Sequence, residues 1–255
     1  MIPIIYNLLI AMAILSAFFI IYLKRQDPSI VDVAFTTSLI VMSISTYYLI
    51  DHKTAATHLF LLMSLLWGAR LVILLIKRYQ LGQKDRRYDE LKSAFEDQQI
   101  KKFFFFFLFQ GLAAFFLSFN FVVAYSYVSE IGFIQILAFV LFVLFLGLEI
   151  LADYQMFQYR KVHHAKPGVL REGLWKYSRH PNYFFEVLVW CSFALFSTTG
   201  YHAIVGWLAV GLLTYFIFRV TGIPATEELM LKTKGEAYKQ YQRTTSSFFP
   251  WFPKS

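Results

Sequence analysis

Long apolar runs recur along the chain and constrain its fold more than any other feature. They follow one another from the amino terminus to residue 222. A helix of about 20 apolar residues is long enough to cross the hydrocarbon core of a bilayer. Only 16% of the residues are charged, whereas a soluble domain carries roughly a quarter. We therefore predict an all-α polytopic membrane protein in which residues 1–255 form a single integral membrane domain.

The apolar runs divide into seven expected transmembrane helices. Their expected bounds are 3–23, 30–50, 56–76, 103–127, 131–155, 182–199 and 202–222. No basic residue precedes the first run, which is long enough to span. We therefore expect it to be a transmembrane helix and not a cleaved leader.

The basic residues of the loops test this arrangement. Seven spans place every loop lysine and arginine on one side of the membrane, except Lys53. By the positive-inside rule this side is cytoplasmic, with the amino terminus outside and the carboxyl terminus inside. Most loop acids share that face, which predicts folded, mixed-charge loops. The net charge of +8 thus reflects membrane topology, and we expect no nucleic-acid partner.

Several classes of site lack the residues they need. Cys191 is the sole cysteine, which excludes an internal disulfide and a cysteine metal site. The glycine motifs of Rossmann and P-loop nucleotide sites are absent. The adjacent pair His163–His164 has no acid or cysteine at ligand spacing, so we expect no metal. A channel or transporter stays open as an alternative, although glycine and proline breaks within the spans are few.

Two further segments carry structural predictions. We expect the loop 77–102 to contain a helix on the membrane surface, with a solvated linker as the alternative for residues 90–99. Phe103–Phe107 is a run of five phenylalanines. Such a run is typical of a lipid-facing or interfacial anchor.

The fifth expected helix carries a polar stripe. Glu149 and Asp153 lie four residues apart and Arg160 follows seven residues later. At 3.6 residues per turn these side chains fall within about 40° of one face. The helix must then continue beyond the bilayer. An intrahelical ion-pair ladder is the alternative, although two neighbouring acids repel each other.

Polar residues on other spans suggest a common cavity. Asp32 lies at the start of the second expected helix, where it could instead simply complement the helix dipole. Arg70 lies within the third, and the alternative is that its side chain snorkels to the membrane surface. Asn182 and Glu186 share a face of the sixth. Polar groups at such depth cost free energy and usually serve a function. We infer a polar cavity that opens to the cytoplasm.

The start of the sixth helix suits an anion. Pro181 is a natural first helical residue, and Arg179 and His180 stand directly before it. The positive end of the helix and these side chains would together favour a phosphate group.

Five segments carry a resemblance to a known family. They are SIVDVAF (29–35), WGARL (67–71), DRRY (85–88), LWKYSRHPNYFFE (174–186) and the tail from 221 to 254. With these motifs the chain resembles bacterial members of the steroid 5-alpha-reductase-like family, in the branch defined by the domain of unknown function 1295. The resemblance implies seven transmembrane helices and NADPH bound in a cavity facing the cytoplasm. It also implies reduction of a carbon–carbon double bond conjugated with a ketone, in a steroid or similar lipid.

The resemblance also assigns roles to residues. The first three helices would lie on the substrate side, and residues 131–255 would bind the cofactor. The expected catalytic residues are Asp32, Tyr88 and Glu186. The expected NADPH-binding residues are Arg70, Arg86, Arg87, Glu149, Asp153, Arg160, Arg171, Tyr177, Arg179, His180, Asn182 and Tyr183. We expect a monomer in the bacterial inner membrane that takes a hydrophobic substrate and contacts membrane lipid.

Three positions depart from the family pattern and leave an alternative open. Phe185 replaces a glycine, Glu149 stands where steroid reductases have an amide, and Trp67 occupies the position of a tyrosine. The RHP element and the acidic pair Glu227–Glu228 also resemble membrane methyltransferases that use S-adenosylmethionine, of the isoprenylcysteine carboxyl methyltransferase type. A methyltransferase is therefore the alternative to a reductase.

Overall fold

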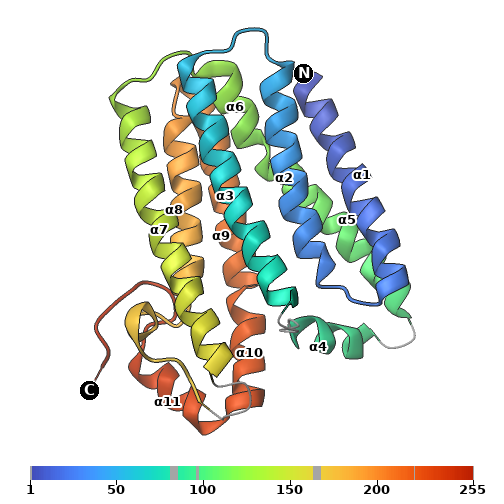
Figure 1. Cartoon of the computed structure of the whole chain (residues 1–255), viewed down its shortest axis with the longest axis vertical. Helices are drawn as coiled ribbons and strands as arrows, with labels where there is room; N and C mark the ends of the chain where they lie inside the picture. The colour runs from blue at the N-terminus through green and yellow to red at the C-terminus, as the bar shows by residue number, and fades with distance from the viewer. Residues whose placement is uncertain (1, 81–85, 96–97, 163–167, 221, 255) are drawn as a thin grey trace. The chain divides into compact units, whose positions relative to one another are not determined.

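The structure is a computed structural model that describes residues 2–80, 86–95, 98–162, 168–220 and 222–254, without the side chains of residues 79, 80 and 86 (Figure 1). Every regular element within these ranges is a helix. The predicted all-α class is therefore confirmed for the described part of the chain.

The helices follow one another in a simple order. Their bounds are α1 Ile2–Arg25, α2 Ile30–Leu49, α3 Ala55–Gln80, α4 Arg86–Phe95, α5 Gln99–Leu117, α6 Phe119–Tyr127, α7 Phe133–Val162, η2 Gly173–Lys176, α8 Pro181–Phe196, η3 Gly200–His202, α9 Ala203–Arg219, α10 Ile223–Lys234 and α11 Glu236–Thr244.

Six helical stretches of the described chain are long and apolar enough to cross a membrane. They are Ile2–Arg25, Ile30–Leu49, Ala55–Arg78, Gln99–Tyr127, Phe133–Val162 and Gly200–Lys234. The helix α8 is also apolar but has only 16 residues. The expected apolar helices are thus present, and six of them have the length and composition of membrane spans.

The chain divides into two compact units. Unit 1 contains Met1–Phe139 and Phe193–Val210, and unit 2 contains Val140–Ser192 and Gly211–Ser255. The divisions fall within α7, α8 and α9.

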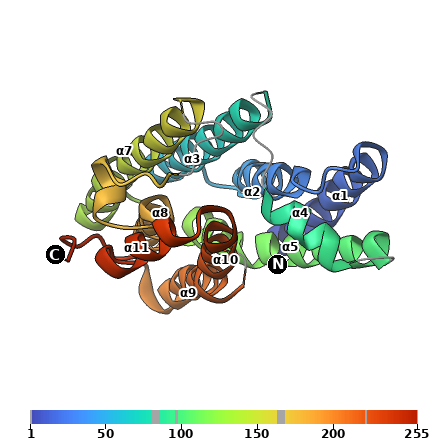
Figure 2. The ribbon, with the colours of Figure 1, turned by 90° about the horizontal axis from the view of Figure 1, so that it is seen from below.

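In unit 1, α1 packs beside both α2 and α5, as Figures 1 and 2 show. Hydrogen bonds reinforce this packing, because the buried Asn7 amide of α1 donates to Thr46 Oγ1 at 3.1 Å and Ser118 Oγ at 3.2 Å. Ser118 separates α5 from α6, and its own hydroxyl donates to the Phe115 carbonyl at 2.7 Å. Such serine back-bonding bends helices, which explains why the expected helix 103–127 is divided.

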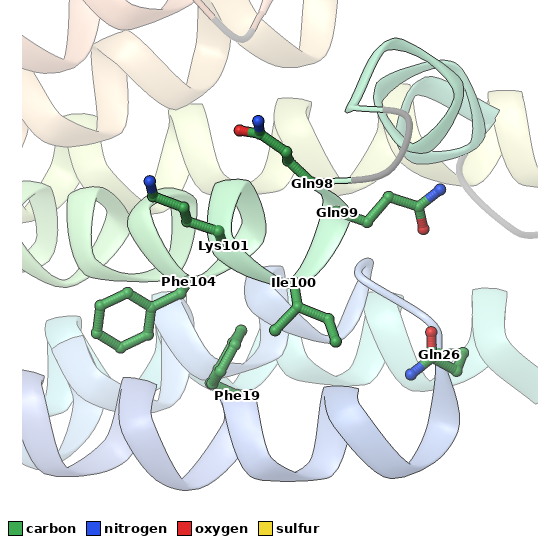
Figure 3. A pocket seen from close by; sticks show the side chains of 7 residues that line it. All are labelled: Phe19, Gln26, Gln98, Gln99, Ile100, Lys101 and Phe104. Atoms are coloured by element: carbon green, nitrogen blue, oxygen red, sulfur yellow. The ribbon is translucent and has the colours of Figure 1, made fainter.

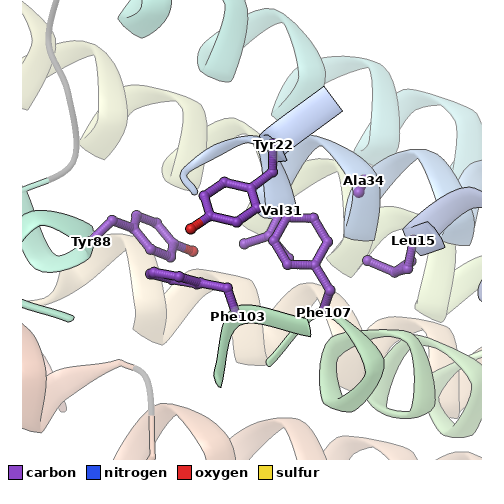
Figure 4. Packing of buried hydrophobic residues seen from close by; sticks show 7 residues of the cluster. All are labelled: Leu15, Tyr22, Val31, Ala34, Tyr88, Phe103 and Phe107. Carbon is purple, nitrogen blue, oxygen red and sulfur yellow. The ribbon is translucent and has the colours of Figure 1, made fainter. Parts of the chain in front are cut away.

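The phenylalanine run does not face lipid as a whole. Phe103 and Phe107 are buried, whereas Phe104 and Phe105 are 46% and 55% exposed. The spacing of four residues puts Phe103 and Phe107 on one face of α5, where they enter the core of unit 1 (Figure 4). The expectation of a purely lipid-facing or interfacial anchor is therefore wrong for these two residues.

In unit 2, the C-terminal part of α7 continues past the expected end at residue 155 to Val162. The whole helix has 30 residues, which corresponds to about 45 Å and exceeds a hydrocarbon core of roughly 30 Å. The predicted continuation of this helix as far as Arg160 is confirmed. The helices α10 and α11 pack together (Figure 2), and α11 buries Tyr238 and Tyr241.

Candidate functional site

A carboxylate and a phenol meet in unit 1. Asp32 lies in the first turn of α2, and Tyr88 lies in the first turn of α4. The Tyr88 hydroxyl donates to Asp32 Oδ1 at 2.7 Å. Lys92, on the same short helix, donates to the Gln26 carbonyl and so ties α4 to the connection before α2. Two of the three predicted catalytic residues are therefore in direct contact.

The pair borders an aromatic cluster. Tyr88 is 8% exposed and packs with Tyr22, Phe103 and Phe107 in the core of unit 1 (Figure 4). The ring of Phe106 lies 6.2 Å from that of Tyr88. The hydroxyl of Tyr22 is buried and has no hydrogen-bond partner among the residues that the structure describes. Apolar rings around a hydrogen-bonded acid exclude water and strengthen its electrostatic interactions.

The other residues predicted on this unit lie on α3 and α4. Arg70 and Arg87 are both half-buried. Trp67, at the position of the family's tyrosine, is 1% exposed and packs edge-on against Phe193. The side chain of Arg86 lies outside the described part of the structure.

An open groove in unit 1 is distinct from these residues. It has a volume of about 760 Å³ and is lined by Phe19, Gln26, Gln98, Gln99, Ile100, Lys101 and Phe104 (Figure 3). No predicted site residue lines it. It therefore adds no geometry to the site proposed from the sequence.

In unit 2, the predicted acids of α7 are buried. Glu149 is 2% exposed and Asp153 is 5% exposed. The Asn182 amide of α8 donates to Asp153 Oδ1 at a long distance of 3.5 Å. The structure thus brings together residues that the sequence placed on two separate helices. Arg160 lies farther along α7 and is exposed.

The remaining predicted residues of α8 contact their own surroundings. Glu186 accepts a hydrogen bond from Trp190 Nε1 at 3.0 Å. Tyr183 shares a hydrogen bond with Thr226 at 3.4 Å. Phe185, which replaces the family's glycine, is buried and fills space that a glycine would leave open.

Arg179 and His180 converge on Glu227 of α10. The carboxylate accepts hydrogen bonds from Arg179 at 2.8 and 3.1 Å, and His180 Nε2 lies 2.8 Å from Oε1. It also accepts from Tyr238 at 3.0 Å and from the Gln242 amide. We call these five residues the Glu227 cluster. Burial and the negative charge of Glu227 raise the pKa of Tyr238 well above its usual value, so its hydroxyl remains a donor.

The guanidinium groups of Arg171 and Arg179 donate hydrogen bonds to backbone carbonyls in the C-terminal part of unit 2. Arg171 donates to the Ala237 carbonyl at 2.6 Å and lies 5.6 Å from the ring of Tyr241. Arg179 Nη1 donates to the carbonyls of Gln242 and Thr245 at 3.2 and 2.6 Å. These contacts tie residues 171–179 to α11 and the segment after it.

Sequence reasoning did not find the centre of this cluster. Glu227 was noted as half of an acidic pair, yet 47 residues separate it from His180. Spacing therefore gave no reason to join them. Its neighbour Glu228 instead pairs with Lys232 on the exposed surface, at 2.8 Å. The structure thus separates the two acids that the sequence presents as a unit.

The described residues contain no group of three histidine, cysteine, aspartate or glutamate side chains that could hold a metal ion. His163 and His164 lie outside those residues.

Comparisons with known proteins find matches over most of the chain. Residues 18–245 match the family described as "Protein of unknown function (DUF1295)". The chain is 27% identical over 233 residues to "Uncharacterized protein C594.04c" of Schizosaccharomyces pombe, covering 80% of this chain and 67% of that protein. No solved structure matches. The family match extends over most of the chain and establishes its membership.

Proposed function

We propose that this chain, which belongs to the DUF1295 family, is a membrane-bound NADPH-dependent reductase. Its substrate would be a hydrophobic enone, steroid-like or another lipid, and it would reduce the conjugated carbon–carbon double bond. The observation that carries the proposal is the 2.7 Å hydrogen bond between Tyr88 and Asp32 beside an aromatic cluster. A hydrophobic ketone needs an apolar wall and a polar group at its oxygen, and this place offers both.

The chemistry requires a hydrogen-bond donor at the carbonyl oxygen. Bound NADPH would provide the hydride for the β-carbon of the enone. Negative charge would develop on the carbonyl oxygen, and a proton from solvent would complete the reduction at the α-carbon. Tyr88, or Asp32 in its protonated form, would donate a hydrogen bond to that oxygen. A preorganised donor of this kind contributes roughly 2.7–4 kcal/mol to lowering the barrier.

The polar groups of unit 2 fit a dinucleotide. Glu149 and Asp153 are buried carboxylates that can accept hydrogen bonds from ribose hydroxyls, and the Asn182 amide can bind a carbonyl or hydroxyl group. Arg179 and His180 contact Glu227, so we assign them a positioning role at the start of α8. Arg160, exposed on α7, is a candidate for contact with a phosphate.

The proposed topology includes α8 as a seventh span. This assignment places the basic loops on the cytoplasmic side, with the amino terminus outside. It also places the start of α8, where Asn182 lies, towards the cytoplasm, from which NADPH would be taken. In this proposal the protein resides in a bacterial inner membrane.

A methyltransferase that uses S-adenosylmethionine is the second candidate. The observation in its favour is the Glu227 cluster, because it joins the RHP element to Glu227, one acid of the pair, and both features are shared with the methyltransferases.

The cofactor retained after purification in mild detergent distinguishes the two candidates. We expect NADP(H) in the released small-molecule fraction, and NADPH consumption when a panel of hydrophobic enones is supplied. Asn182→Ala and Asp153→Ala should lose NADPH binding while the protein stays folded. Retained S-adenosylmethionine, or unchanged NADPH affinity in both variants, would contradict the proposed reductase site.

A further inference from the structure

The C-terminal segment Phe248–Lys254, which we call the aromatic tail, exposes three large apolar side chains. Phe249, Trp251 and Phe252 are 67%, 71% and 75% exposed. Grouped apolar side chains on a surface usually mark a site of interaction with protein or membrane. The tail therefore needs an environment other than water.

The tail is held in place by hydrogen bonds to the loop before α8. Trp251 N donates to the Tyr177 carbonyl at 2.9 Å, and Ser178 Oγ donates to the Phe248 carbonyl at 2.8 Å. Just before the tail, Arg179 N donates to the Ser246 carbonyl at 2.8 Å. The backbone is therefore fixed at the surface on both sides of Pro250.

The buried end of the tail shows its depth along the helices. Phe248 is 6% exposed, and its ring lies 5.4 Å from that of Phe184 on α8 and 4.6 Å from that of Phe218 on α9. Its cluster also includes Val187 and Leu213. Phe184 lies three residues from the start of α8 and Phe218 one residue from the end of α9, so the ring of Phe248 lies within about 5 Å of these helix ends along the axis.

If the helices cross a membrane, this depth corresponds to the boundary of the hydrocarbon core. The helix α8 has 16 residues, so it is about 24 Å long and shorter than a hydrocarbon core of roughly 30 Å. If α8 crosses the membrane, as the topology in the proposed function has it, its first turns lie at the boundary of the hydrocarbon. The tail, packed against those turns, then lies at the same level.

Positive charges flank the exposed aromatic side chains. Lys254 is the last residue of the tail and is exposed, and the exposed Lys176 Nζ lies 5.8 Å from the ring of Tyr177. That ring is itself 5.9 Å from Phe252. Aromatic residues with neighbouring lysines are typical of membrane–water interfaces, where the ammonium groups reach the headgroups.

We propose that the aromatic tail is a lipid-interface anchor. Phe249, Trp251 and Phe252 lie among the headgroups and upper acyl chains of the leaflet on the side of the basic loops. Lys176 and Lys254 bind anionic headgroups there. Because the tail bonds to residues 177–179, its contact with lipid also holds the loop that leads into α8 and Asn182.

Site-directed spin labelling tests the anchor in the full-length protein. Cys191 is the sole cysteine, so a Cys191→Ser background allows one label, placed by Trp251→Cys in one variant and by Phe252→Cys in another. Glu236→Cys is the matched control, because the Glu236 side chain is 81% exposed at the start of α11. Each variant is reconstituted into vesicles of phosphatidylethanolamine and phosphatidylglycerol.

We expect the labels at 251 and 252 to collide more often with oxygen than with a water-soluble nickel complex, and the label at 236 to show the reverse. Equal access of the nickel complex to all three labels would overturn the anchor. The same contrast should persist with one copy per nanodisc. Its loss there would show that a second copy, and not lipid, covers the tail.

The outcome is independent of the enzymatic proposal. Labels at 251 and 252 protected by lipid in a protein that binds no NADPH would leave the anchor standing and contradict the reductase. NADPH-dependent turnover by a protein whose tail is open to water would contradict the anchor alone.

Discussion

Two carboxylates in different units have contrasting surroundings. Glu227 accepts hydrogen bonds from a guanidinium group, a tyrosine and an amide, and a histidine ring lies within 2.8 Å. Asp32 accepts a hydrogen bond from Tyr88, a phenol at the border of an aromatic cluster. The first contact network joins three segments of unit 2, whereas the second contact lies beside the apolar rings of the unit 1 core.

We infer from this difference that Glu227 serves the stability of the fold and that Asp32 serves turnover. A carboxylate fixed by a cation and several donors stabilises the fold, and removing one partner leaves the other charge buried. A neutral phenol can exchange one acceptor for another at little cost in charge. We therefore expect changes in the Glu227 cluster to act on folding and changes at Asp32–Tyr88 to act on turnover.

The largest expected effect is that of Glu227→Gln. Arg179, whose side chain is 11% exposed, would keep a buried charge without its carboxylate. We expect the free energy of unfolding to fall by about 3 kcal/mol, measured by titration with sodium dodecyl sulfate. The double variant Arg179→Gln/Glu227→Gln is the control and should recover part of the loss. Equal stability of Glu227→Gln and the natural protein would contradict a structural role.

Tyr88→Phe should have the next largest effect, and on a different quantity. It removes the hydroxyl but keeps the ring in the aromatic cluster. We expect NADPH-dependent turnover of an enone to fall by about 10²–10³, the usual result of removing one transition-state donor. NADPH affinity and the unfolding midpoint should change little.

A second tyrosine provides the control for this prediction. Tyr48 belongs to the same unit and is 71% exposed, so Tyr48→Phe should leave turnover intact. If Tyr88→Phe instead lowered stability and kept its turnover, the hydrogen bond to Asp32 would be structural, and the contrast between the two carboxylates would disappear.

Sequence patterns predict the positions of the helices and only part of the site. Apolar runs set the helices because burial of backbone groups in lipid leaves few other structures. The division at Ser118 escaped prediction because it depends on a serine hydroxyl bonding to its own helix. Asp32 and Tyr88 were both predicted as donors, yet their contact joins positions 56 residues apart. No local pattern encodes such a contact.

Gly173→Ala should produce a smaller loss of stability in the segment that leads to Arg179. Gly173 has a φ of +58°, and a Cβ there would collide with the side chain of Gln155, whose oxygen accepts from Leu174 N at 3.0 Å. Strain of this kind costs about 1–3 kcal/mol. The control is Gly147→Ala on α7, where a Cβ meets no atom within 4 Å. If the two alanines have equal effects on the unfolding midpoint, the strain argument fails.

The smallest expected effect concerns Glu228, the neighbour of Glu227. Its carboxylate pairs with Lys232 one turn away, and the two side chains are 65% and 54% exposed. Exposed pairs of this spacing contribute only about 0.3–0.5 kcal/mol. Glu228→Gln should therefore change the unfolding free energy by no more than this amount and leave NADPH-dependent turnover unchanged, whereas Glu227→Gln in the same assays destabilises the protein. A loss of activity with unchanged stability in Glu228→Gln would show that the acidic pair acts as a unit in chemistry, and it would favour the methyltransferase over the reductase.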